Sequence, residues 1–144
     1  MNQTTGSHCI LELFECPKQL LDDEQFICQT LRSAAKESGS TLLSLTSHKF
    51  SPQGVTALGL LAESHISIHT WPEKGYAAAD VFTCGRGCDP LKACRFLVKQ
   101  LKALRHSRSM IQRGPVHATD ISNSKKHFHS EDQCLQMPPL SRFG

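Results

Sequence analysis

The chain has 144 residues, of which 39% are hydrophobic and 20% are charged, and its formal net charge is +3. This length predicts one domain with a core large enough to fold without disulfide bonds. The basic excess gathers in residues 92–126 without interleaved aromatic residues, so we expect no nucleic-acid partner. No apolar run approaches the roughly 20 residues of a bilayer span, so we expect no membrane association.

The N-terminal residues and the cysteines indicate the cellular compartment in which the protein resides. Residues 1–8 are polar and lack the basic, apolar and small-residue order of a secretory signal, which predicts a cytoplasmic protein. The sequence has seven cysteines and no Cys-x-x-Cys pair. In a reducing compartment this pattern favours free thiols over disulfides or a zinc site.

Four elements are expected in the first half: a strand over 8–14, a helix over 22–38, and strands over 41–50 and 55–62. The helix has apolar residues at helical spacing, a capping carboxylate at Asp22 or Asp23, and Gly39 at its end. The strand over 55–62 is mostly apolar, which predicts a central place in a sheet.

The second half is expected to contain a strand over 64–70, a turn at 71–75, a strand over 76–83, a loop at 84–88 and a helix over 90–105. In the first of these strands, strict alternation places His65, Ser67 and His69 on one face. Asp89 and Pro90 form a typical helix start.

The apolar pattern fades after Ser107, where a short strand near Met110 or Val116 is expected. Residues 120–144 are expected to form a mobile tail, which leaves residues 1–119 as the single domain.

This order of elements predicts an α+β fold. We expect a two-layer sandwich with a mainly antiparallel sheet and helices packed on one face. The other face of the sheet would then be bare and partly apolar. A bare apolar face favours dimerisation, so we expect the chain to dimerise through the sheet side.

Residues 63–84 concentrate the chemically active side chains of the sequence. Singly, these residues have ordinary structural roles: His65 and His69 as surface residues of a strand, and Cys84 as a small buried residue. Ser64 lacks the Gly-x-Ser-x-Gly elbow of serine hydrolases. His65 and His69 stand at i and i+4 of a strand, about 13 Å apart, which is too far for one metal ion.

The pattern as a whole resembles the bacterial short-chain S-adenosylmethionine decarboxylase proenzymes, the pyruvoyl-dependent prokaryotic class 1B type. The densest matches are Glu63-Ser64-His65, Ile68 to Glu73 (IHTWPE), Gly75-Tyr76-Ala77 and Asp80 to Gly85 (DVFTCG). Earlier matches are Gly6-x-His8, Glu15-Cys16 and His48-Lys49-Phe50-x-Pro52-x-Gly54. The resemblance covers residues 6–105, and the motifs are specific at this spacing.

The resemblance implies that the chain cuts itself between Glu63 and Ser64. The Ser64 hydroxyl would attack the Glu63 carbonyl to form an ester, and elimination would leave a pyruvoyl group at position 64. The products would be a β chain, 1–63, and an α chain, 64–144. His69 matches the proton acceptor of processing, a role that suits imidazole near neutral pH.

In turnover, the resemblance implies that the substrate amine forms a Schiff base with the pyruvoyl group made from Ser64. That group supplies the electron sink that no standard side chain offers, so neither a metal nor pyridoxal phosphate is expected. Cys84 matches the proton donor, and a thiol is mostly protonated at neutral pH. Phe50 and Glu73 match substrate-binding positions, an aromatic face for the sulfonium or adenine and an acceptor for ribose hydroxyls.

The implied reaction converts S-adenosylmethionine to its decarboxylated form and carbon dioxide for spermidine biosynthesis. The implied assembly is a homodimer of αβ units with active sites at or near the interface. Two positions depart from the family: Ser7 stands where relatives carry arginine, and Thr56 where many carry serine. Because Ser7 affects the expected pocket, a pyruvoyl decarboxylase of ornithine or arginine stays an alternative. A second alternative is a non-enzymatic partner that binds and activates another subunit and never cleaves itself.

Overall fold

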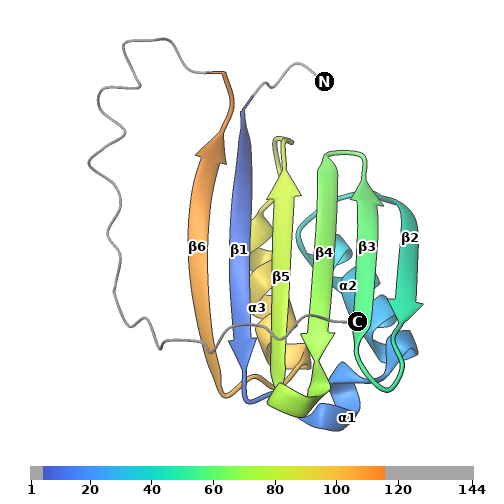
Figure 1. Ribbon diagram of the computed structural model, residues 1–144. Helices are drawn as coiled ribbons and strands as arrows, with labels where there is room; N and C mark the ends of the chain where they lie inside the picture. The colour runs from blue at the N-terminus through green and yellow to red at the C-terminus, as the bar shows by residue number, and fades with distance from the viewer. Residues whose placement is uncertain (1–4, 116–144) are drawn as a thin grey trace.

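The computed structural model describes residues 5–115, which form one sheet with helices on one side (Figure 1). The elements in chain order are β1 (Gly6–Phe14), α1 (Lys18–Leu21), α2 (Glu24–Glu37), β2 (Leu42–Lys49), β3 (Val55–Leu61), β4 (Ser64–Trp71), the short 3-10 helix η1 (Pro72–Lys74), β5 (Tyr76–Thr83), α3 (Pro90–Gln100) and β6 (Arg105–Arg113). The expected tail, 120–144, and Val116 lie outside the described residues.

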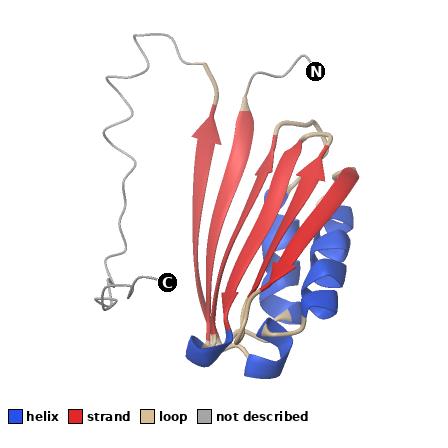
Figure 2. Ribbon diagram, turned by 45° about the vertical axis from the view of Figure 1, so that its right-hand side comes forward, coloured by secondary structure: helices blue, strands red, loops and turns tan. Residues whose placement is uncertain are grey.

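The six strands form one sheet in the order β2-β3-β4-β5-β1-β6, and every neighbouring pair is antiparallel. Helices α2 and α3 pack side by side on one face, and the other face carries no helix of the described residues (Figure 2). The expected two-layer α+β sandwich is therefore confirmed. Among residues 5–115, no helix has the length and apolar character needed to cross a bilayer.

The core lies between this sheet face and the two long helices. Fully buried leucines and isoleucines from both layers meet there: Leu11, Leu13, Ile27, Leu31, Ile66, Ile68 and Leu97. Each such side chain contributes about 1.5–3 kcal/mol relative to an exposed position. In β4, Ile66 and Ile68 are buried against the helices, while His65 and His69 lie on the open face, as the sequence pattern predicts; Ser67 shares that face but is itself buried.

Helix α2 begins as expected, with one of the two candidate caps. The Asp23 carboxylate accepts a hydrogen bond from the amide of Phe26 at 3.0 Å. Asp22 instead accepts from the amide of Gly54 at 2.9 Å and pairs with Lys49. Asp22 therefore ties the β2–β3 turn to the start of α2.

The expectation for the C-terminal half of the domain was wrong in two respects. Helix α3 ends at Gln100, not at residue 105, because Lys102 adopts a left-handed φ of 51°. Leu104, which falls inside the expected helix, is 79% exposed. The chain then forms β6, nine residues long rather than a short strand, which pairs with β1 along its whole length.

Strand β3 has an interior place in the sheet, as its apolar sequence predicts, but only one of its faces is covered. Leu58 and Leu60 point to the open face and are 47% and 55% exposed. The apolar character of this strand therefore extends to a surface that the chain itself leaves bare.

Candidate active site

The bond between Glu63 and Ser64 lies in the tight turn that joins β3 to β4. Leu61 and Ser64 are paired across the two strands, so only Ala62 and Glu63 form the turn. Ser64 has a φ of 153°, a positive value that residues other than glycine rarely adopt. Such a conformation costs on the order of 1–3 kcal/mol and is concentrated at functional sites.

The carbonyl of Glu63 is held by the neighbouring strand end. The backbone amide of Cys84 donates to this carbonyl oxygen at 3.0 Å. The Glu63 carboxylate is anchored separately, since it accepts from the amide of Thr41 at 3.0 and 3.3 Å. The carbonyl therefore faces a fixed donor where negative charge would develop on attack.

Cys84 directly follows β5, whose last residue, Thr83, is paired with Ser64 on one side and Ser7 on the other. The thiol lies against β1, because a Cβ placed on Gly6 would come within 2.6 Å of its sulfur. Glycine at position 6 is thus what lets β1 pass this close to Cys84. Like the other five cysteines of the described residues, Cys84 is free.

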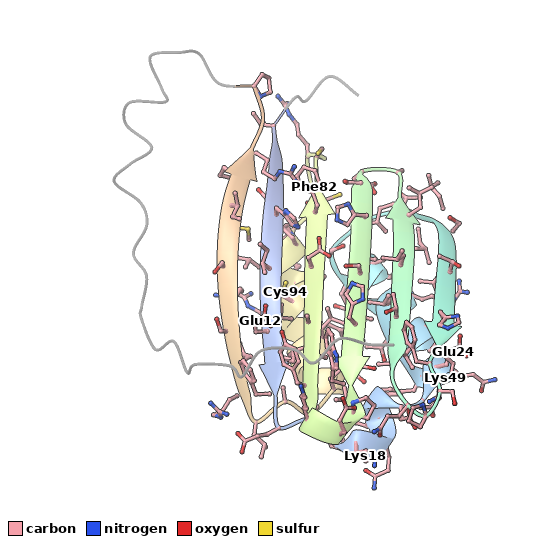
Figure 3. All side chains as sticks on the ribbon, in the orientation of Figure 1. Glu12, Lys18, Glu24, Lys49, Phe82 and Cys94 are labelled. Atoms are coloured by element: carbon pink, nitrogen blue, oxygen red, sulfur yellow. The ribbon has the colours of Figure 1, made fainter. Side chains whose placement is uncertain are left out.

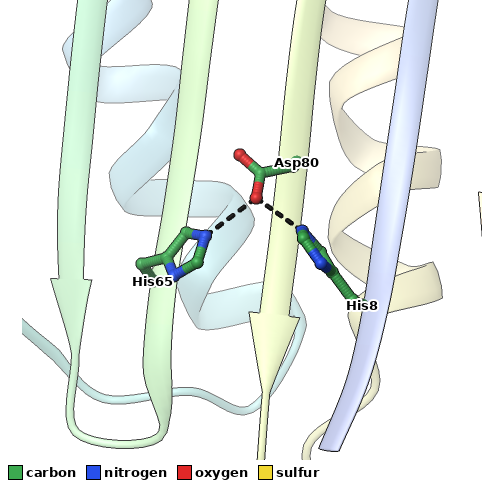
Figure 4. Close-up of side chains that lie close together, drawn as sticks. All are labelled: His8, His65 and Asp80. Carbon is green, nitrogen blue, oxygen red and sulfur yellow. Dashed lines mark hydrogen bonds and ion pairs between the residues drawn. The ribbon is translucent and has the colours of Figure 1, made fainter. Parts of the chain in front are cut away.

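A cluster of His8, His65 and Asp80 lies on the open face beside the β3–β4 turn (Figure 4), and Ser67 of β4 joins it through a hydrogen bond to Asp80. Asp80 Oδ2 accepts from His8 Nε2 at 2.6 Å and from His65 Nε2 at 2.8 Å, while Ser67 donates to the other carboxylate oxygen. On its other side, His65 Nδ1 lies 3.3 Å from the Ser64 hydroxyl oxygen. The cluster therefore connects Ser64 to a carboxylate through one imidazole.

The Asp80 carboxylate is partly buried among these donors. Burial alone would raise the pKa of Asp80, but hydrogen bonds from Ser67, His8 and His65 outweigh it and hold the pKa below its ordinary value. The cluster is closed at its outer end by Arg113, which lies 3.4 Å from His8 Nδ1. Asp80 is thus an ionised acceptor that orients both imidazoles.

The ligand atoms of His8, His65 and Asp80 lie within 4.8 Å of one another, a set that resembles a metal-binding group. Metal binding would need the Nε2 lone pairs of both histidines. Both Nε2 atoms instead point at Asp80 within hydrogen-bond distance, and the Arg113 guanidinium adds positive charge beside them. The geometry fits a hydrogen-bond network better than a metal centre.

His69 lies at the other end of the same strand. It is five positions after Ser64, roughly 17 Å along the strand, and it pairs with Ala78 rather than with Thr83. Its Nδ1 lies 2.9 Å from the hydroxyl oxygen of Thr56, so threonine retains the contact that a serine would make there. Within one chain, therefore, His69 does not reach Ser64.

The two expected substrate-binding residues lie at the His69 end as well. Phe50 is in the β2–β3 loop, is 47% exposed and packs edge-on against His48, with ring centroids 4.6 Å apart. Glu73 is exposed in η1, directly after β4. Figure 3 shows the two ends: Phe82 lies near the Ser64 turn and Lys18 near η1. One chain thus brings together Glu63, Ser64 and Cys84, but not His69, Phe50 or Glu73.

Ser7, expected from the sequence to depart from the family pattern, lies at the Ser64 end on the edge of this site. It is paired with Thr83 of β5 and Gln112 of β6, and its hydroxyl shares a hydrogen bond with the Gln112 side chain at 3.2 Å. The serine therefore has a local partner in β6 and no charge to offer a substrate.

No chemical role was expected for His8, His65 or Asp80 from the sequence. One signal was available for part of the cluster: a hairpin turning at 71–76 pairs Ser67 with Asp80. His8 could not be added in that way, because the pairing of β1 with β5 joins segments more than 60 residues apart.

Comparison with known proteins finds one family that matches most of the chain. It matches the family model described as S-adenosylmethionine decarboxylase over residues 7–114. It is similar to the S-adenosylmethionine decarboxylase proenzyme of Synechococcus sp. (strain WH7803), with 56% identity over 120 residues, 83% of this chain and 94% of the relative. The protein of the same name from Thermotoga maritima is 43% identical over 125 residues, 87% of this chain and 96% of the relative.

A solved structure agrees with these relatives. The crystal structure of the adenosylmethionine decarboxylase from Aquifex aeolicus VF5 superposes with a TM-score of 0.72 and is 37% identical in sequence. The match covers 81% of this chain and 96% of that one. The likeness thus extends over sequence and fold together.

Proposed function

Because the chain belongs to the S-adenosylmethionine decarboxylase family, we propose that it cuts itself between Glu63 and Ser64 and then decarboxylates S-adenosylmethionine. The observation that carries this proposal is the backbone of Ser64. A serine held at a φ of 153°, next to a carbonyl that the Cys84 amide polarises at 3.0 Å, is prepared for attack on that carbonyl.

In the proposed cleavage, the Ser64 oxygen forms a bond to the Glu63 carbonyl carbon and the peptide C–N bond breaks. The ester then loses the Ser64 α-proton, the bond between Ser64 Cβ and oxygen breaks, and Glu63 leaves as a carboxylate. Water replaces the nitrogen of the remaining dehydroalanine, ammonia departs, and a pyruvoyl group stays at position 64. The chains 1–63 and 64–144 result, without oxidant or metal.

The site fits a pyruvoyl group. Residue 64 would lose its backbone nitrogen and its tetrahedral Cα, and with them the unfavourable φ, so cleavage relieves the local strain. Once formed, the group would supply the carbonyl that accepts the electrons released with carbon dioxide. Cys84 is the adjacent thiol, and we assign to it the proton that returns to the substrate carbon.

We further propose that a homodimer completes the active site. His69 is the proposed acceptor of the Ser64 α-proton, yet it lies roughly 17 Å along β4 from Ser64. The open face of the sheet carries His69 and the exposed Leu58 and Leu60. Two copies packed through this face would supply both ends of β4 to one site and would cover the apolar surface.

The same arrangement would bring the aromatic face of Phe50 and the carboxylate of Glu73 to the partner's Ser64 end. A sulfonium cation and an adenine both favour an aromatic face, and ribose hydroxyls favour a carboxylate acceptor. The relatives described above favour S-adenosylmethionine over ornithine or arginine, and an enzyme over a non-enzymatic subunit. The free cysteines of the described residues, Cys84 among them, suit a reducing cytoplasm.

The substrate is tested by release of labelled carbon dioxide from carboxyl-labelled S-adenosylmethionine, ornithine and arginine, with the Ser64→Ala protein as the blank. We expect release from S-adenosylmethionine alone. Release only from ornithine or arginine would overturn the substrate. A chain that is never cut and releases nothing would overturn the enzyme.

The shared site is tested by mixing two inactive chains, one with Ser64→Ala and one with His69→Gln. In mixed dimers, the intact His69 of the first chain should act on the Ser64 of the second, so the second chain is cut. If the His69→Gln chain is never cut in the mixture, His69 does not act across the interface.

A further inference from the structure

We propose that His65 accepts the proton of the Ser64 hydroxyl in the first step of self-cleavage, and that Asp80 positions its imidazole for this task. The inference rests on the proposed function and deepens it, because it assigns a different step of self-cleavage to each of two histidines. His65 would serve the attack of Ser64 on the Glu63 carbonyl, and His69 the later removal of the α-proton.

His65 is the imidazole that lies beside the Ser64 hydroxyl. The Nδ1 atom of His65 lies 3.3 Å from the Ser64 hydroxyl oxygen, the only imidazole contact of that oxygen among the described residues. This separation is slightly long for a hydrogen bond, as is common before a reaction complex tightens. His69 sits at the far end of β4, and in the proposed dimer it would reach Ser64 only from another copy.

The tautomer of the His65 imidazole also suits this role. Ionised Asp80 can only accept, so the His65 Nε2 atom at 2.8 Å must carry the hydrogen. In a neutral imidazole the other nitrogen, Nδ1, then has the free lone pair, and that atom faces the hydroxyl. The carboxylate also stabilises the imidazolium that forms when Nδ1 takes the proton.

The orienting carboxylate is itself held by donors from two neighbouring strands, β1 and β4. His8 of β1 donates to Asp80 at 2.6 Å, and Ser67 of β4 donates to its second oxygen. Arg113 of β6 lies 3.4 Å from the other nitrogen of His8, which it can reach as a donor, and its guanidinium stacks 4.7 Å from the Phe82 ring centroid. Phe82 of β5 contacts both imidazoles, with centroids at 5.2 and 5.9 Å.

The proposed step conserves atoms and charge without any group from outside the chain. The hydroxyl O–H bond breaks as its proton moves to His65 Nδ1, and the oxygen bonds to the Glu63 carbonyl carbon while the Cys84 amide holds the carbonyl oxygen. The C–N bond then breaks, and His65 returns the same proton to the departing Ser64 nitrogen. The products are an ester and a free amine, and the imidazole is regenerated neutral.

The test follows freshly made uncut chain by intact mass, with and without hydroxylamine, which cuts the ester but not the amide. His65→Gln keeps a donor to Asp80 but has no nitrogen that takes a proton. We expect it to slow loss of the precursor by about 100- to 10,000-fold, with no hydroxylamine-sensitive ester. The matched control, His106→Gln, changes an exposed histidine of β6 and should leave the rate unchanged. The His69→Gln chain should instead accumulate the ester.

A second variant separates the positioning role of Asp80 from a structural one. Asp80→Asn retains the shape of the carboxylate and removes its charge. It should slow ester formation and move the pH midpoint of the cleavage rate to lower pH, because the imidazolium loses its stabilising partner. His65→Ala should regain part of the rate in imidazole buffer, even where His65→Gln folds poorly.

Cleavage of the His65→Gln chain at the wild-type rate would overturn the inference, and so would accumulation of the ester in that chain. An unchanged pH midpoint in Asp80→Asn would overturn the role of Asp80. Each of these results leaves the proposed function standing, because the wild-type chain still cuts. A wild-type chain that never cuts would overturn the proposed function, and the inference with it.

Discussion

The backbone amide of Cys84 donates to the carbonyl oxygen of Glu63, with 3.0 Å between nitrogen and oxygen. This contact ties the end of β5 to the β3–β4 turn. Removal of one such donor from an oxyanion site costs about 3–4 kcal/mol of transition-state stabilisation. In the proposed enzyme, one residue thus serves both reactions with different atoms, its backbone nitrogen in self-cleavage and its thiol in turnover.

Replacing Cys84 with alanine should therefore separate the two reactions. The variant keeps the backbone amide, so the chain should still cut itself at Glu63–Ser64. Turnover should fall by about 100- to 10,000-fold, because no acid returns the proton to the substrate carbon. Intact mass measures the first reaction and carbon dioxide release the second. Full turnover by this variant would remove Cys84 from the mechanism.

Gly6→Ala should slow turnover, because residue 6 of β1 lies directly against the Cys84 thiol. The new Cβ would lie 2.6 Å from both the Cys84 sulfur and a carbon of the Phe82 ring, so one of these groups must move. We expect turnover to fall at least 10-fold while self-cleavage persists, since a 1 Å misplacement can cost about 100-fold in rate. Thr5→Ala, at an exposed neighbouring position, is the control. Unchanged turnover by Gly6→Ala would show that the position of the thiol is not critical.

Leu58→Asp should prevent dimerisation. Leu58 is 47% exposed on the open face of the sheet, and a charge there would be buried without a partner in the proposed dimer. Sedimentation should show a monomer at concentrations where the wild-type chain is a dimer. Leu104→Asp, at a 79% exposed position in the loop after α3, should leave the dimer intact. A dimeric Leu58→Asp protein would place the interface elsewhere.

The His8–Asp80–His65 cluster predicts a pH dependence of stability. Folding lowers the pKa of Asp80, so its contribution is fully present above the unfolded value, about 4, and is lost as the pH falls through the lower folded value. Urea unfolding of the uncut Ser64→Ala chain between pH 6 and about pH 3 measures this loss. Adding Asp80→Asn should flatten that part of the profile. Parallel profiles for the two proteins would contradict the assignment.

The parts of the fold that bury apolar residues could be predicted from the sequence. Alternation in β4 and helical spacing in α2 both reflect contact with one core. The full length of strand β6 could not be predicted in this way, because all nine of its residues are exposed. Backbone pairing with β1, rather than burial of apolar side chains, holds this strand in place. Its sequence has no apolar period to detect.

The active site likewise contains residues that could be predicted from the sequence and residues that could not. Glu63, Ser64 and Cys84 were predicted by resemblance, and the structure places them together at one end of the sheet. The separation of His69 from Ser64 follows from strand geometry alone and points to a second copy. Predicting the Asp80 cluster would have required the register between β1 and β5, a long-range pairing that local sequence does not specify.

The most direct test of the account is the intact mass of freshly purified protein under denaturing conditions. We expect two chains that divide at Glu63–Ser64, the larger one lighter than a serine-started fragment by the mass of one ammonia. The Ser64→Ala protein should stay a single chain. A wild-type protein that remains one uncut chain after long incubation would contradict the central claim that Ser64 becomes the cofactor.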